Sequence, residues 1–130
     1  MSDRDIEKRT FEFALRIIRL CRTLGDDRTG CVLMNQLLRS GTSIGANVEE
    51  AQGAQSKRDF IAKMSISQKE ARETLYWLRL IVESELLSAD RMVPIIQEAD
   101  EILRIISAII VSARKNAPAA NAIGKDQKAK

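Results

Sequence analysis

Apolar side chains recur at intervals of three and four residues along most of the chain, which places them on one face of an α-helix. Four such segments are separated by short runs that contain Gly, Ser and Asp, and no stretch shows the two-residue alternation of a half-buried strand. The pattern therefore predicts an all-α protein of four helices, each of roughly 20 to 30 residues.

The first helix is expected from about Asp5 to Leu24, where Gly25 ends it. It carries two apolar stripes, one of Phe11, Ala14, Ile18 and Cys21 and the other of Phe13, Ile17, Leu20 and Leu24. The second helix is expected to begin after Thr29, which suits the N-cap position, and to end near Gly53. Its inward stripe consists of Leu33, Leu37, Ser40, Ile44, Asn47, Ala51 and Ala54.

Ser56 and Asp59 have the spacing of a capping box, which predicts the start of a third helix that runs to about Glu85. Its apolar stripe consists of Phe60, Met64, Ser67, Ala71, Leu75, Leu78 and Val82. The fourth helix is expected to end near Lys115, and its start has two alternatives. Either Ser88 caps a first turn that is followed by a kink, or the regular helix begins at about Pro94.

Four helices with short connections predict an antiparallel up-down-up-down bundle. The chain has 130 residues, which suits one domain. We expect the bundle domain to span residues 1–115. Residues 116–130 are small, polar and rich in lysine, and we expect them to form a flexible, disordered tail.

The fourth helix is more apolar than a bundle helix needs to be. Between Ile102 and Ala113 only Arg104, Ser107 and Ser112 are polar. The run is too short for a membrane span, so contact with another copy of the chain explains it better. The predicted homo-oligomer interface comprises Ile102, Ile105, Ile106, Ile109 and Ile110.

The second and third helices hold an unusual number of polar residues near their apolar stripes. Gly41 and Gly45 are four residues apart, so they share a helix face and predict close packing of another helix there. A buried polar network that fixes helix register is expected from Ser43, Asn47, Glu50, Lys69, Glu70 and Glu73. The alternative is a carboxylate site for Mg²⁺ or Mn²⁺ built from Glu49, Glu50, Glu70 and Glu73.

Composition narrows the chemistry further. The chain has no histidine, which excludes a Ser-His-Asp triad and any metal site with imidazole ligands. Two cysteines without a signal peptide indicate free thiols and a cytoplasmic protein. The net charge is only +3, and the clearest basic excess lies in the first helix. Its candidate nucleic-acid-binding residues are Lys8, Arg9, Arg16, Arg19 and Arg22.

The stretch from Ser40 to Ile81 resembles the 23S rRNA intervening-sequence protein family. The matching positions are Ser43, Ile44, Asn47, Glu50, Ser56, Asp59, Phe60, Lys69, Glu70, Ala71, Glu73, Thr74, Tyr76, Trp77 and Leu78. The resemblance implies an antiparallel four-helix bundle that assembles into a ring, usually a homopentamer, with no enzyme activity and no cofactor. It also suggests kinship with pentameric retroelement accessory proteins that bind nucleic acid.

The sequence thus favours a non-enzymatic, ring-forming scaffold, with a homopentamer preferred and weak binding of RNA or another nucleic acid. One alternative is an oligomeric scaffold for protein partners without a nucleic-acid role. A third hypothesis is a metal-dependent enzyme that uses the Glu50 and Glu73 carboxylates. We expect no membrane partner and no small-molecule substrate.

Overall fold

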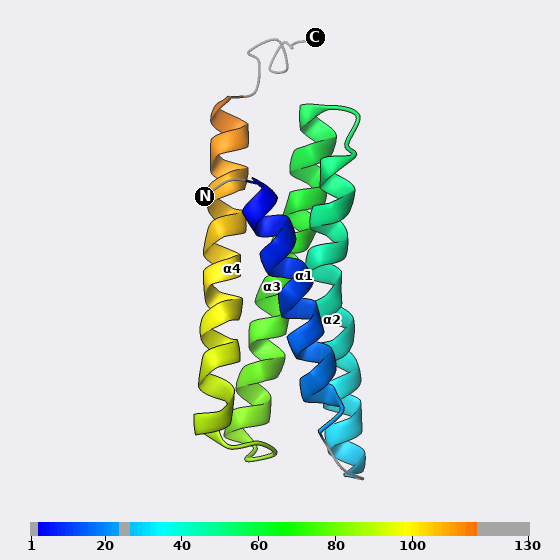
Figure 1. The fold of residues 1–130 in the computed structure, drawn as a ribbon, viewed down its shortest axis with the longest axis vertical. Coiled ribbons are helices and arrows are strands. Elements are labelled where there is room, and N and C mark those ends of the chain that lie inside the picture. Colours follow the sequence, from blue (N-terminus) through cyan, green and yellow to red (C-terminus); the bar gives the residue numbers. More distant parts are fainter. Residues whose placement is uncertain (1–2, 24–26, 117–130) are drawn as a thin grey trace.

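Four helices occupy the part of the chain that the computed structural model describes, which is residues 3–23 and 27–116. They are α1 (Asp3–Cys21), α2 (Arg28–Gln52), α3 (Lys57–Glu83) and α4 (Ala89–Lys115). Each helix packs against its neighbours in sequence, and α1 closes the bundle by packing on α4 (Figure 1). The predicted antiparallel up-down-up-down bundle is confirmed. The predicted tail begins at Asn116, which caps α4, and from residue 117 onward it lies outside the described residues.

The helix starts follow side-chain caps, with one correction. Asp27, not Thr29, is the N-cap of α2, because its Oδ1 accepts a hydrogen bond of 3.1 Å from the Gly30 N–H. At α3, Ser56 Oγ accepts from the Asp59 N–H at 3.0 Å, as predicted. The Asp59 carboxylate reaches back to the N–H of Gln55, one residue before the N–H that a capping box uses.

The fourth helix begins at the earlier of its two predicted starts. Ser88 Oγ accepts from the Arg91 N–H at 3.3 Å, and Pro94 lies inside α4. Proline at this position removes one backbone donor, yet α4 extends on both sides of it, from Ala89 to Lys115. At the other end of the chain, α1 ends at Cys21 instead of Leu24, which itself lies outside the described residues.

The end of α3 has a conformation that the sequence does not announce. Glu85 has a φ of 63°, in the left-handed region that glycine usually occupies at this place. The Leu86 N–H donates to Ile81 O at 3.1 Å and the Glu85 N–H to Val82 O at 3.0 Å, which is a Schellman motif. The helix therefore ends at Glu83 rather than at Glu85.

All four helices contribute to one apolar core. Of the two stripes on α1, Phe13 and Ile17 are fully buried, whereas Phe11 of the other stripe is 66% exposed. The remaining fully buried large side chains are Ile6, Leu37, Ile44, Met64, Leu78, Ile81, Met92, Ile102 and Ile106. Each of them removes enough apolar surface from water to contribute about 1.5–3 kcal/mol. None of the helices described is long and apolar enough to span a bilayer.

The helices differ in length, which leaves one end of the bundle incomplete. The first has 19 residues while α3 and α4 have 27 each, so α1 is shorter by about 12 Å at a rise of about 1.5 Å per residue. In Figure 1 the start of α1 lies well below the upper ends of α3 and α4. Among the described residues, only those of α2, α3 and α4 continue to that end.

Candidate functional site

A charged cluster joins α2 to α3 at the surface of the bundle. Arg39 of α2 lies between two carboxylates of α3, with Nη1 3.3 Å from Glu70 Oε1 and Nη2 donating to Glu73 Oε2. Trp77 Nε1 donates to the same Glu73 oxygen at 2.9 Å. Lys69, the cation that the sequence placed beside these carboxylates, is exposed. The cation that binds them is Arg39, which sequence reasoning missed.

The α2 residues of the predicted polar network bond elsewhere. Ser43 Oγ donates to Arg39 O at 2.7 Å, and Asn47 Nδ2 donates to Ser43 O at 2.9 Å, so both side chains return to their own helix. Glu50 is 64% exposed and pairs with Lys63 at 3.2 Å. No buried network of these residues forms within one chain.

The carboxylates proposed as a metal site are separated along the bundle. Glu50 lies at the level of Lys63, whereas Glu73 lies at the level of Arg39, eleven residues away from Glu50 on α2. That separation is roughly 16 Å along the helix axis, too far for the two to share one ion. Within the described ranges, no group of three or more His, Cys, Asp or Glu residues could hold a metal ion.

Buried hydroxyl groups form the polar contacts between α2 and α3. Ser67 Oγ donates to Ile44 O at 2.8 Å, and Thr74 Oγ1 lies 3.0 Å from Ser40 Oγ. All three hydroxyl-bearing side chains are fully buried. Such bonds form at only one axial alignment of the helices, so they favour the observed register. Ser40 and Ser67 interrupt apolar stripes in the sequence, which is the signal that could have identified them.

Gly41 and Gly45 of α2 face α1. A Cβ atom at Gly41 would lie 2.9 Å from Cγ1 of Ile17, and one at Gly45 would lie 3.2 Å from the backbone oxygen of Thr10. The missing side chains therefore allow α1 and α2 to approach closely, because any larger residue would contact the opposite helix.

The basic residues of α1 fall into different environments. Arg9 binds Glu98 and Glu101 of α4, so its charge is neutralised. Arg22 lines a cavity on the α2 side of α1. Arg16 and Arg19 line a different cavity together with Arg91 of α4, while Lys8 is exposed. The structure thus divides the predicted basic face and adds Arg91, which sequence reasoning missed.

The predicted oligomer interface on α4 needs correction. Ile102 and Ile106 are fully buried within the chain, and Ile110 is 2% exposed. These three residues recur every four positions and face the chain's own core, so no partner could contact them. Ile105 and Ile109 lie to one side and are partly buried.

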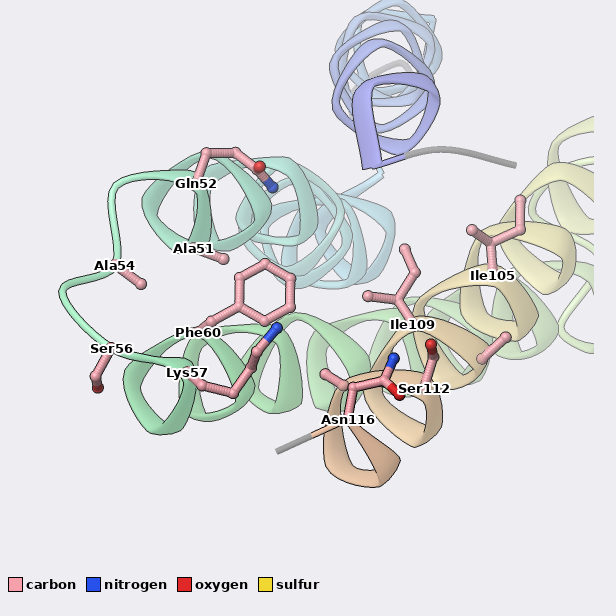
Figure 2. A pocket seen from close by; sticks show the side chains of 12 residues that line it. Ala51, Gln52, Ala54, Ser56, Lys57, Phe60, Ile105, Ile109, Ser112 and Asn116 are labelled. Carbon is pink, nitrogen blue, oxygen red and sulfur yellow. The ribbon is translucent and has the colours of Figure 1, made fainter. Parts of the chain in front are cut away.

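A groove of about 670 Å³ lies at the end of the bundle that α1 does not reach. It separates the ends of α2 and α3 from α4, and Figure 2 shows Phe60 facing Ile109 across it. Ala51 of α2 and Ile105 of α4 extend its apolar wall, and Lys57 is its charged lining residue. The groove thus combines apolar side chains with polar ones, and no carboxylate lies in its lining.

The sequence of this chain is similar to that of a known protein family. The family model for the 23S rRNA-intervening sequence protein matches residues 2–108. The chain belongs to this family. This match confirms the family resemblance that the stretch between Ser40 and Ile81 suggested.

A solved structure agrees with this assignment to the 23S rRNA-intervening sequence proteins. It is a crystal structure from Bacteroides thetaiotaomicron, described as a protein with unknown function from the S23 ribosomal protein family. The two chains are 42% identical with a TM-score of 0.80, over 85% of this chain and 98% of that chain. A comparison with curated proteins gave no match. The comparisons therefore establish family and fold without an activity.

Several of the residues that this chain shares with the 23S rRNA-intervening sequence family have structural roles. Ser56 caps α3 and Thr74 bonds to Ser40 within the core. Glu73 holds both Arg39 and Trp77. These positions stabilise helix ends and helix contacts, so the surface basic residues and the apolar groove are the features left for a binding role.

Proposed function

We propose that this 23S rRNA-intervening sequence protein is a non-enzymatic scaffold that assembles into a homo-oligomeric ring, with a pentamer favoured. The observation that carries the proposal is apolar surface that a single chain leaves open. Phe11 is 66% exposed on α1, and Ile105 and Ile109 line the open groove. Large apolar patches are rare on soluble monomers, and contact with another copy would cover them.

A ring requires two different surfaces on each chain, because each copy contacts one neighbour on either side. The side of α1 around Phe11 and the groove beside Phe60 are two such surfaces on different elements. Two such different surfaces are what a head-to-tail arrangement requires. The preference for five copies comes from the family resemblance.

Light scattering in solution tests the assembly. The expected mass is near five times 14.6 kDa. Phe11→Ser should lower that mass, whereas Val32→Ser, which changes an exposed apolar residue of α2, should leave it unchanged. A monodisperse wild-type monomer would overturn the proposal, and a loss of assembly only in Val32→Ser would move the contact away from α1.

Weak binding of RNA is a second function for the assembled ring. It is supported by Arg16 and Arg19, which have no carboxylate within ion-pair distance in the described ranges. Several copies of these side chains would build a basic surface that one chain with a net charge of +3 lacks. Each neutralised phosphate would steepen the dependence of affinity on salt.

Binding to labelled RNA and to duplex DNA, measured from low to moderate salt, tests this function. Arg16→Glu combined with Arg19→Glu should abolish binding. The same charge change on α3, Arg58→Glu with Arg72→Glu, is the matched control and should weaken binding far less. If the wild-type ring binds neither nucleic acid at low salt, the RNA role is wrong and a scaffold for protein partners replaces it.

A further inference from the structure

The seam between α1 and α4 has two halves with different charges. In one half Arg9 of α1 meets Glu98 and Glu101 of α4 at 2.6 Å and 2.8 Å. In the other half Arg16 and Arg19 of α1 share a cavity of about 280 Å³ with Arg91 of α4. The first half is therefore complementary, whereas the second places like charges on both sides.

The arginines of the second half lack carboxylate partners. Within the described ranges Arg9, Arg39 and Arg104 each have an acidic partner, and Arg16, Arg19 and Arg91 have none within ion-pair distance. Like charges around one cavity repel each other, and the surrounding water and salt only partly screen them. An anion in the cavity would relieve this repulsion.

The position of Arg91 strengthens the need for an anion. Arg91 is the third residue of α4, next to the helix end that carries partial positive charge. A cation is unfavourable there, whereas an anion is favoured both by the helix end and by the guanidinium group. The backbone N–H of Arg91 is already used by the Ser88 cap, so its side chain is the group available to a ligand.

We infer that this cavity, the three-arginine pocket of Arg16, Arg19 and Arg91, binds a phosphate group of an RNA backbone. This inference rests on the proposed RNA role. It places the point at which an RNA strand crosses from α1 to α4 at this pocket. Guanidinium groups match the two free oxygens of a phosphodiester with paired hydrogen bonds. Leu20 and Ile95, which also line the pocket, supply an apolar surface for the adjoining sugar.

The test compares three variants with the intact wild-type protein. Arg91→Gln removes a guanidinium from the pocket and leaves the helix cap, which is a backbone bond, in place. Arg91→Lys keeps the positive charge but loses the planar guanidinium group, whose N–H donors can bond to two phosphate oxygens at once. Arg58→Gln removes an exposed arginine near the start of α3, at the opposite end of the bundle, and is the matched control (Figure 1).

The first measurement is affinity for a short single-stranded RNA of about ten nucleotides across a salt series. Arg91→Gln should weaken binding by about three- to tenfold and reduce the log-log salt slope by about 0.7. Arg91→Lys should keep the slope while weakening binding, and Arg58→Gln should change neither. Normal wild-type binding with equal effects of Arg91→Gln and Arg58→Gln would overturn the pocket and leave the RNA role standing.

The second measurement needs no RNA. Pyrophosphate should raise the thermal unfolding temperature of the wild-type protein more than sodium chloride of equal ionic strength does, and Arg91→Gln should lose that difference. If wild-type protein binds no RNA yet shows this shift, the phosphate pocket stands and its ligand is not RNA. If it shows neither RNA binding nor the shift, the pocket is wrong as well.

Discussion

Arg9 of α1 and Glu98 of α4 form a bidentate ion pair, with Nη2 2.6 Å from Oε1 and Nε 3.2 Å from Oε2. Glu101 accepts a further bond from Nη2 at 2.8 Å. Hydrogen bonds to Glu98, which contributes most, and to Glu101 raise the pKa of the Arg9 guanidinium above its ordinary value. Because both Arg9 and Glu98 are mostly shielded from water, the pair is stronger than an ordinary surface pair.

Loss of this pair should weaken the bundle measurably. Arg9→Gln is expected to lower the free energy of unfolding by about 1–2 kcal/mol, because a partly buried carboxylate loses its charged donors. Glu101→Gln should cost less, since that side chain is 60% exposed. Urea unfolding of Arg9→Gln, Glu98→Gln and the double variant measures the coupling, and additive effects would show that the pair contributes nothing.

Close approach of α1 and α2 makes Gly45 sensitive to one added methyl group. Alanine gains about 1 kcal/mol in helix propensity, but its Cβ would press on the Thr10 backbone oxygen, which costs about 1–3 kcal/mol. We expect Gly45→Ala to lower the free energy of unfolding by about 1 kcal/mol. Gly53→Ala is the control, since its nearest neighbour would be 3.8 Å away. Stabilisation by Gly45→Ala would contradict the close packing.

Glu85 offers the opposite test to Gly45, because a glycine at this position should stabilise the folded protein. Its left-handed backbone is unfavourable for a residue with a side chain by about 1–2 kcal/mol, while glycine loses more entropy on folding. Glu85→Gly should therefore raise the free energy of unfolding by about 0.5–1 kcal/mol. Glu83→Gly, two residues earlier within α3, should lower it. The thermal unfolding temperatures of the two variants should move in opposite directions.

The two cysteines have free thiols in different environments, so we expect them to differ in reactivity. Burial raises the pKa of the Cys21 thiol, so less of it is thiolate near neutral pH, while Cys31 is exposed. Iodoacetamide should label Cys31 well before Cys21, as followed by mass spectrometry. The labelling rate of Cys21 should keep rising as the pH is raised past the ordinary thiol range. Equal rates at both residues at neutral pH would contradict this environment for Cys21.

The sequence predicted local features well because they depend on neighbouring residues. Ser56 and Ser88 identified two helix starts, since a cap acts within three residues. The sequence placed the end of α3 within two residues, but the left-handed conformation of Glu85 could not be predicted, because glycine or asparagine normally signals it. The sequence predicted Thr29 as the cap of the second helix, but Asp27, whose side chain can also accept a capping bond, has that role.

Contacts between distant helices were harder to predict. Arg39 reaches Glu73 because its long side chain crosses between helices, and nothing in the spacing of either residue signals that contact. Arg91 lies far from Arg16 in sequence, so the shared cavity appears only after α4 packs on α1. For Ile102 and Ile105, the apolar excess of the helix was visible, but the side that faces the core depended on helix rotation.

The pattern of helix neighbours has a consequence for how the chain folds. Three of the four helix contacts join consecutive helices, and the remaining one, between α1 and α4, is the least extensive. Local hairpins form quickly, whereas the chain ends must close a long loop before their contact stabilises anything. We therefore expect the α1–α4 seam to close late in folding, so that weakening it accelerates unfolding much more than it slows folding.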